Sequence, residues 1–212
     1  MLGNIGAGKT TLLNFFNNEN RNIRMKVLLE PIRRFRKFER HDPLTMAISK
    51  PGVNSVVAQF HIIKQLNLNF RTVLNNHTPD DILITDRSLF SPIPFTQTLC
   101  DMDIISEFAK DYLYTETLET AAKTLHENSA KYIAAVYLHS PSSLCMDRIH
   151  SRGREGENEY STEYLEKLEV NLLKCLERWK REIGHDNVYI LETKDLSSLH
   201  IEFNDILKRY ID

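Results

Sequence analysis

The feature that most constrains this chain is a glycine-rich segment near its start, followed by a lysine and a threonine. The segment fits the pattern G-x-x-x-x-G-K-T and comprises Gly3, Asn4, Ile5, Gly6, Ala7, Gly8, Lys9 and Thr10, with Thr11 directly after it. Glycines let the backbone wrap a phosphate so that successive N–H groups point inward. The lysine reaches the outer phosphates, the threonine hydroxyl is a Mg²⁺ ligand, and the following helix adds its N-terminal partial charge. The segment therefore predicts a P-loop that binds a nucleoside triphosphate and Mg²⁺.

Beyond this loop, short apolar runs alternate with longer stretches of helical periodicity. Continuous aliphatic runs predict buried strands at residues 25–30, 81–86, 132–138 and 188–191. Helices are predicted at residues 10–18, 55–75, 104–126, 142–152, 162–183 and 196–210. This alternation predicts an α/β fold with a central, mostly parallel sheet flanked by helices, in one domain that spans residues 1–212. Ligands bind beyond the carboxyl ends of such strands, which is where Glu30 and Asp86 are predicted to lie.

The strand that normally precedes a P-loop is not evident, since only Met1 and Leu2 come before Gly3. A loop whose backbone geometry is so demanding needs a buried strand behind it. We therefore expect that the first strand is missing from this sequence, or that the sheet is completed in another way.

Composition argues against several other classes of protein. A formal net charge of −2 gives no basic footprint for nucleic acid or an anionic membrane, so the basic run at residues 32–40 is interpreted as a solvated helix face. No stretch approaches the roughly 20 apolar residues of a membrane span, and the start does not resemble a signal peptide. Three distant cysteines and eight scattered histidines argue against a disulfide framework or a zinc site. We expect a cytoplasmic protein, with a mitochondrial or host-cell location left open, that binds neither nucleic acid nor membrane.

Two charged motifs follow the first two predicted strands. Asp86 can hold a Mg²⁺-bound water, and the adjacent Arg87 can reach a substrate or a phosphoryl group in transfer. Glu30 precedes Pro31, which stops strand pairing and turns the chain. Its carboxylate can accept the proton of an attacking hydroxyl. Taken alone, each motif is also compatible with a surface ion pair or a simple turn.

A cluster of arginines follows the third predicted strand and is predicted to form a lid at about residues 148–160. It contains Arg148, Arg152, Arg154 and Glu157. Arg148 and Arg152 are one helical turn apart and share a face, and the glycines at 153 and 156 loosen the segment. Several arginines around a phosphoryl group neutralise the charge on its oxygens in the transition state. The alternative is an exposed, charge-rich helix end.

In this combination and order, these motifs resemble the deoxynucleoside kinase family, which includes the thymidine kinases of the herpesviral and mitochondrial type. The resemblance runs from residue 3 to about residue 168 and includes Gln59, a lone amide in an otherwise apolar helix that needs a hydrogen-bonding partner. It implies a P-loop kinase fold with a helical lid, ATP as phosphate donor, a deoxynucleoside as acceptor, and a homodimer. Glu30 is then the base that takes the proton of the 5′-hydroxyl, Arg87 contacts the 5′ oxygen, and Glu157 binds the sugar 3′-hydroxyl. Gln59 binds the edge of the nucleobase.

The remaining assignments that follow from the resemblance concern the donor. The P-loop and the three lid arginines hold ATP, and Thr10 and Asp86 hold its Mg²⁺. Asp86 stands where the family often has glutamate, a change that keeps the carboxylate.

The sequence departs from the family pattern at several positions. Ile48 stands where the family usually has a tyrosine that helps to bind the 3′-hydroxyl, and isoleucine cannot form a hydrogen bond. The aromatic residue that is expected to stack on the base falls near Thr96, with Phe95 one place away, and Pro92 and Pro94 are expected to disturb this segment.

The residues around the base indicate its class. Leu66 and Pro92 stand where members selective for cytidine or purines have an arginine and an aspartate. Apolar residues there resemble the thymidine-preferring and broad-specificity branch. The sequence therefore predicts a kinase for a deoxynucleoside that is a pyrimidine, thymidine or deoxycytidine.

Two alternatives stay open. A nucleoside monophosphate kinase such as thymidylate kinase shares the P-loop, the Asp-Arg motif and the lid, but needs a further arginine for the substrate phosphate. A nucleotide-binding homologue that no longer catalyses transfer would accommodate Ile48 and the missing strand.

Overall fold

The computed structural model of the chain describes residues 1–20, 22, 24–32, 52–78, 80–154, 156–193 and 195–211. Its strands lie in two parallel pairs. β1 (Met25–Leu28) pairs with β2 (Ile82–Thr85), and β3 (Ala135–His139) pairs with β4 (Val188–Glu192). These four strands coincide with the four predicted runs, with differences of one to three residues at one or both ends.

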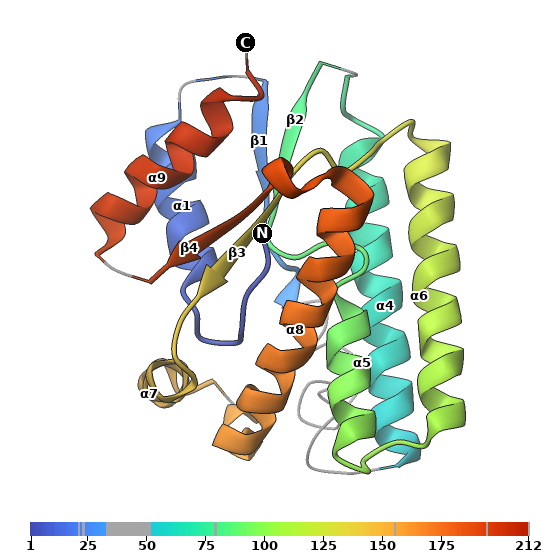
Figure 1. Cartoon of the computed structure of the whole chain (residues 1–212). Coiled ribbons are helices and arrows are strands. Elements are labelled where there is room, and N and C mark those ends of the chain that lie inside the picture. Colours follow the sequence, from blue (N-terminus) through green and yellow to red (C-terminus); the bar gives the residue numbers. More distant parts are fainter. Residues whose placement is uncertain are drawn as a thin grey trace.

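Residues 1 and 2 lie between the two pairs and join them. The Met1 nitrogen donates to the Thr85 carbonyl at 2.6 Å, and the Leu2 nitrogen donates to the Val136 carbonyl at 2.7 Å. The Leu138 nitrogen in turn donates to the Leu2 carbonyl at 2.9 Å, in a parallel bridge. The chain end marked N accordingly lies in the middle of the sheet (Figure 1). The position behind the P-loop, where a strand was expected, is therefore occupied by these two residues, between β2 and β3.

Helices cover both faces of the sheet (Figure 1). α1 (Lys9–Glu19) and α9 (Leu196–Lys208) pack together on one face. On the other face α8 (Thr162–Ile183) packs against β3 and β4, and α5 (Pro92–Asp101) packs against α8. α4 (Val53–Leu74) and α6 (Glu107–Glu127) pack against each other and against α5. α7 (Ser142–Arg152) and the short 3₁₀ helix η1 (Glu157–Glu159) follow β3, and η2 (His185–Asn187) leads from α8 into β4. The predicted α/β fold with a parallel sheet is confirmed.

The helices are held by apolar stripes that face the sheet. α8 begins at the cap residue Ser161, whose hydroxyl accepts from the Tyr164 nitrogen at 3.1 Å. Its leucines at 165, 168, 172 and 176 recur at helical spacing and are almost completely buried. On the opposite face, Phe16 of α1 meets Phe203 of α9 edge to face, with ring centroids 5.5 Å apart. The core therefore fixes α8 and α1, the two helices that flank the P-loop.

α5 is the helix that sequence reasoning missed. Pro92 and Pro94 were expected to disturb this segment, but they lie in the first turn of α5. Proline is tolerated there because the first backbone N–H groups of a helix have no partner within the helix. The segment is thus helical from Pro92 onward.

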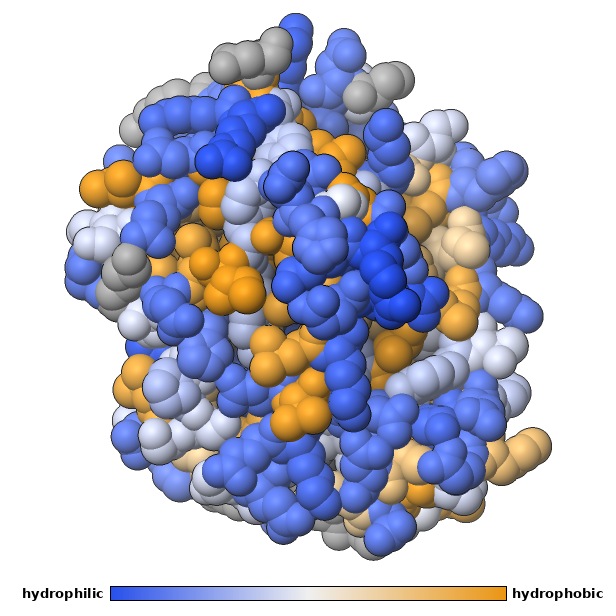
Figure 2. All heavy atoms as spheres, viewed as in Figure 1, coloured by the Kyte–Doolittle hydropathy of each residue, from blue (hydrophilic) through white to orange (hydrophobic). Residues whose placement is uncertain are grey.

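Three further findings concern the earlier expectations. Ile48 and nearly all of the basic run at residues 32–40 lie outside the described residues. The three cysteines are unpaired thiols. Within the described ranges, the helices are too short or too polar to cross a membrane, and hydrophilic side chains cover most of the face shown in Figure 2, with separate apolar groups between them.

Candidate active site

The P-loop connects residue 2 in the sheet to α1 and is tied to its neighbours by side chains. Gly6 and Gly8 have φ values of 80° and 96°, in the left-handed region that favours glycine. The Asn4 amide donates to the Leu165 carbonyl in α8 at 2.9 Å, and its oxygen accepts from the Ile5 nitrogen at 2.9 Å. The loop is therefore held in shape before any phosphate binds.

Lys9 lies at the start of α1 and is buried. Its Nζ donates to the carbonyls of Gly3 and Asn4 at 3.0 and 2.7 Å. Burial, and next the nearby Arg87, lower the pKa of Lys9 from 10.5 to about 8. A buried cation whose hydrogen-bond partners among the described residues are carbonyls gains strongly from an anion, so the residue is suited to bind phosphate oxygens.

Thr10 and Asp86 meet at the base of the loop, although they are 76 positions apart. The Thr10 hydroxyl donates to Asp86 Oδ2 at 2.6 Å, while Asp86 Oδ1 is buried without a partner in the described structure. A buried carboxylate oxygen with no partner calls for a cation or water. Mg²⁺ is usually held by one or two protein oxygens together with waters and substrate phosphates. The two residues therefore fit the predicted Mg²⁺ site, and no set of three or more His, Cys, Asp or Glu side chains in the described ranges offers another.

Arg87 follows β2 in an unusual backbone conformation, with a φ of 72°. Non-glycine residues at positive φ are strained, and such strain clusters at functional sites. Arg87 Nε donates to Glu30 Oε1 at 2.8 Å, and its guanidinium lies 4.5 Å from the centroid of the Phe95 ring. Nη1 is buried with no hydrogen-bond partner among the described residues. The strained turn thus aims a buried guanidinium, whose Nη1 has no partner among the described residues, at the carboxylate predicted to be the base.

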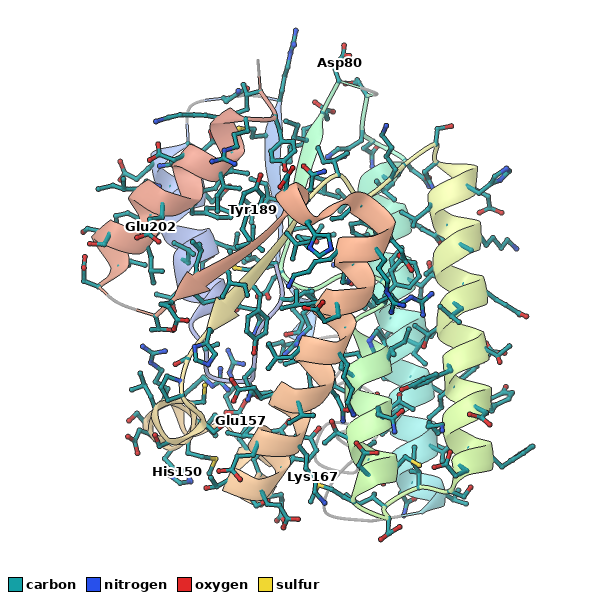
Figure 3. The ribbon with its side chains drawn as sticks, viewed as in Figure 1. Asp80, His150, Glu157, Lys167, Tyr189 and Glu202 are labelled. Atoms are coloured by element: carbon teal, nitrogen blue, oxygen red, sulfur yellow. The ribbon has the colours of Figure 1, made fainter. Side chains whose placement is uncertain are left out.

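The lid arginines do not act alike. Arg148 Nη1 donates to the carbonyls of Gly6 and Ala7, each at 3.3 Å, and to Ser140 Oγ at 3.3 Å. It therefore ties α7 to the P-loop. Arg152 instead makes a bidentate ion pair with Glu157, at 3.0 and 2.8 Å. Glu157 is also 3.8 Å from Arg154 and lies between α7 and the start of α8 (Figure 3).

One cavity of about 460 Å³ brings nearly all these groups together. Of the predicted site residues, those that line it are Ile5, Gly6, Ala7, Gly8, Lys9, Thr10, Thr11, Glu30, Gln59, Arg87, Arg148, Arg152, Arg154 and Glu157. Gly3, Asn4 and Asp86 lie behind this lining, and Asp86 is connected to it through Thr10. The volume is within the range of small-molecule sites, at about 300–1,000 Å³. The roles of these residues in binding and catalysis stay predictions.

One end of the cavity, between α4 and α5, has an apolar wall. Gln59 is buried on α4 and shares a helix face with Ile62 and Leu66, while Pro92 and Phe95 of α5 line the same cavity. Thr96, the other position considered for the stacking residue, is fully buried and is not part of the lining. The register of α5 therefore selects Phe95 as the aromatic residue of this wall.

Sequence reasoning missed several residues of the lining. Ser91, Tyr160 and Tyr164 all line the cavity. The rings of Tyr160 and Tyr164 pack with centroids 5.4 Å apart. A tyrosine four residues from another at the start of a capped, amphipathic helix was the only sequence signal for this pair, and it does not by itself indicate a site.

Comparisons with known proteins identify relatives of this chain. The family model of deoxynucleoside kinases matches residues 1–210. Mitochondrial thymidine kinase 2 of Homo sapiens is 29% identical over 170 residues, which cover 78% of this chain and 59% of that protein. The same protein of Macaca fascicularis matches with the same values. The match thus spans about three fifths of the length of these relatives.

Solved structures show the same fold. The structure of deoxyadenosine kinase from M. mycoides, with the products dCMP and a flexible dCDP bound, has a TM-score of 0.72 and 17% identity, and the match covers 98% of this chain and 97% of that chain. The same kinase with dCTP bound has a TM-score of 0.69 and 18% identity, with the same coverage. At such identities the likeness concerns the fold alone. Because the family model covers nearly every residue, the chain belongs to the deoxynucleoside kinase family.

Proposed function

We propose that this protein transfers the γ-phosphoryl group of ATP to the 5′-hydroxyl of a deoxynucleoside. The observation that carries the proposal is the cavity itself, which joins a P-loop to the Glu30–Arg87 pair and to Gln59. Phosphoryl transfer requires positioning and charge stabilisation more than covalent chemistry, and these residues supply both.

Glu30 and Arg87 form the acceptor end of the proposed reaction. The Glu30 carboxylate accepts the proton of the 5′-hydroxyl as its oxygen attacks, and Arg87 keeps this carboxylate in place through the 2.8 Å hydrogen bond. The unpartnered Nη1 of Arg87 donates to the 5′ oxygen. Phe95, beneath the guanidinium, keeps Arg87 in that orientation.

Lys9, Thr10 and Asp86 form the donor end. Lys9, which donates to the loop carbonyls, would turn to the outer phosphates of ATP. Thr10 and Asp86, which are joined by a hydrogen bond, would hold Mg²⁺. When bound, Mg²⁺ neutralises charge on the phosphate oxygens. Arg148 keeps the P-loop against α7. Arg152 and Arg154 stabilise the charge of the transferring group.

The proposed substrate is a pyrimidine deoxynucleoside. Gln59 offers one donor and one acceptor to the pairing edge of a pyrimidine. Leu66 and Pro92 keep that part of the wall apolar among the described residues, at the two positions where a charged pair would select cytosine or a purine. The name of the relative, thymidine kinase 2, supports this choice.

Phosphate transfer from labelled ATP to thymidine, deoxycytidine and deoxyadenosine tests the proposal. We expect product with at least one pyrimidine and a lower kcat/KM with deoxyadenosine. Thymidine monophosphate is the control acceptor, and turnover of it in place of thymidine would support a thymidylate kinase. Binding of ATP without product from any acceptor would instead support a homologue that no longer catalyses, and would refute the proposal.

We also propose that the protein is a homodimer through α4 and α6. Val53, Val57 and Phe60 lie on one face of α4, and Phe108 and Tyr112 lie on one face of α6. All five are exposed, Phe108 to 83% and Val53 to 77%, and the rings of Phe60 and Tyr112 stack across the two helices at 6.4 Å. An exposed apolar patch that spans two packed helices is typical of a protein interface.

Analytical ultracentrifugation tests this assembly. We expect a mass about twice the 24.7 kDa of one chain for the wild type, and a monomer for the double variant Val53→Lys, Phe108→Lys. Ile201→Lys is the control, because Ile201 is 62% exposed on α9, outside the patch. A wild-type monomer would refute the dimer without affecting the proposed activity.

We propose a location in the cytosol or in mitochondria. The relative's name and the unpaired thiols support it, because both compartments are reducing.

A further inference from the structure

Tyr160 presents a hydroxyl group at the nucleoside cavity that the proposed mechanism does not use. The residue follows η1 and precedes Ser161, the cap of α8. Its side chain lines the cavity together with Glu30, Arg87 and Glu157. Within the described ranges its hydroxyl has no hydrogen-bond partner, while its ring is fixed against Tyr164. A rigidly held hydroxyl with no partner in a binding cavity is available to a ligand.

Glu157 alone cannot satisfy a sugar hydroxyl. An ionised carboxylate only accepts hydrogen bonds, whereas a hydroxyl both donates and accepts. Both oxygens of Glu157 already accept from Arg152 in the bidentate pair. A 3′-hydroxyl that donates to Glu157 therefore still needs a donor for its own oxygen, because an unsatisfied polar group is costly in an enclosed site.

The surroundings of Tyr160 keep it a donor. Burial, and next the Glu157 carboxylate, raise the pKa of Tyr160 well above its usual range. The Glu30 carboxylate also raises the pKa of Tyr160, whereas the Arg87 and Arg152 guanidinium groups lower it. The phenol thus keeps its proton throughout the neutral range. Tyr164 differs, because its side chain is buried in the core with 3% exposed, whereas Tyr160 is half-buried. Glu157 is also not among the charges that affect the pKa of Tyr164.

We propose that Tyr160 donates a hydrogen bond to the 3′-hydroxyl oxygen of the bound deoxynucleoside, while that hydroxyl donates to Glu157. This inference rests on the proposed function and names a binding residue for the same site. The chain has isoleucine at position 48, so a tyrosine that the resemblance would place there is absent from the sequence. Tyr160 supplies a phenol for the same sugar hydroxyl from the turn between η1 and α8.

Removing one hydrogen-bonding group at a time, from the protein and from the ligand, tests the proposal. Calorimetry measures the Kd of thymidine and of 3′-deoxythymidine for the wild type, Tyr160→Phe and Tyr164→Phe. We expect Tyr160→Phe to bind thymidine about tenfold more weakly and 3′-deoxythymidine as the wild type does. Tyr164→Phe, the matched control, removes the same atom from the neighbouring ring and should preserve the wild-type ratio of the two Kd values.

Each other outcome has a definite meaning. If Tyr160→Phe weakens both ligands equally, or neither, Tyr160 does not bind the 3′-hydroxyl and the inference is overturned. If the wild type binds no deoxynucleoside, the proposed function itself fails, which is a different result. Thermal unfolding verifies that each variant is folded. If Tyr160→Phe does not fold, Tyr160→Leu replaces it and is expected to lose the same discrimination between thymidine and 3′-deoxythymidine.

Discussion

Gly6 and Gly8 offer a direct test of how tightly the P-loop is packed. Both have positive φ, but a side chain would meet different surroundings. A Cβ at residue 6 would lie 2.5 Å from the carbonyl oxygen of Cys145, which is part of α7. At residue 8 the nearest atoms are side-chain atoms of Arg148 and Leu138, at 3.8 and 3.9 Å. Alanine at either position is strained, but only alanine at residue 6 collides with backbone.

The cost of each substitution follows from this difference. A non-glycine residue in the left-handed region costs about 1–2 kcal/mol, which applies to both variants. Overpacking adds about 1–3 kcal/mol for Gly6→Ala alone, because a helix carbonyl cannot move without its helix. We therefore expect a loss of about 1–2 kcal/mol for Gly8→Ala and about 2–5 kcal/mol for Gly6→Ala. At about 2–4 °C per kcal/mol for a chain of this size, Tm falls by about 2–8 °C and about 4–20 °C.

Urea unfolding and differential scanning calorimetry of the two variants measure these losses. Gly153→Ala is the control for backbone strain alone, since its φ is 59° and the nearest atom to a Cβ is the His150 carbonyl oxygen at 3.8 Å. Its loss should equal that of Gly8→Ala. An equal loss for Gly6→Ala and Gly8→Ala, or a larger one for Gly8→Ala, would refute the reasoning from contact with α7.

Three further predictions concern ionisable groups. Glu30→Gln should lower kcat by about 10²–10⁴, because the amide cannot take up the proton. The affinity for thymidine should be nearly unchanged, because the amide oxygen still accepts from Arg87. Steady-state kinetics that show less than a tenfold loss would exclude Glu30 as the base. Burial lowers the pKa of Lys9 to about 8, and a bound phosphate favours the charged form, so ATP binding should take up protons above about pH 8 and weaken as pH rises further. Calorimetry in buffers of different ionisation enthalpy measures this proton uptake. The substitution Lys9→Met should abolish it. His139 bridges Glu192 at 2.7 Å and Glu169 at 2.9 Å, and its pKa is raised, chiefly by the hydrogen bond to Glu192. Its folded-state pKa thus exceeds the unfolded value, so this stabilisation is complete below about pH 6.5 and is lost as pH rises through the folded pKa. Urea unfolding between pH 5 and 9 should show that loss in the wild type and not in His139→Gln.

Local motifs made most of the site predictable. The P-loop glycines, Lys9 and Thr10 act within a few residues of one another, so their spacing is itself the signal. Glu30 and Arg87 come at the ends of neighbouring parallel strands, which the rule for α/β sheets places at the same edge. Their hydrogen bond is consistent with that placement.

The residues that were missed depend on helix register and on packing. α5 was not predicted because two prolines normally interrupt a helix, and only their place in its first turn makes them compatible with one. Phe95 and Thr96 are adjacent in sequence, yet one faces Arg87 and the other the core, because neighbouring residues of a helix point in directions about 100° apart. No spacing rule distinguishes the two before the helix start is known.

The sequence alone thus predicted the P-loop residues of the donor site and the order of the strands and of the long helices except α5, because these depend on short-range patterns of residue type. Tertiary structure decided how these parts meet. It placed residues 1 and 2 between β2 and β3. It also joined Arg148 to the P-loop, whereas Arg152 pairs with Glu157. It also brought Tyr160 into the same cavity as Glu30 and Arg87. Such contacts join groups brought together by the packing of the sheet and its helices, and no local pattern of residues encodes them.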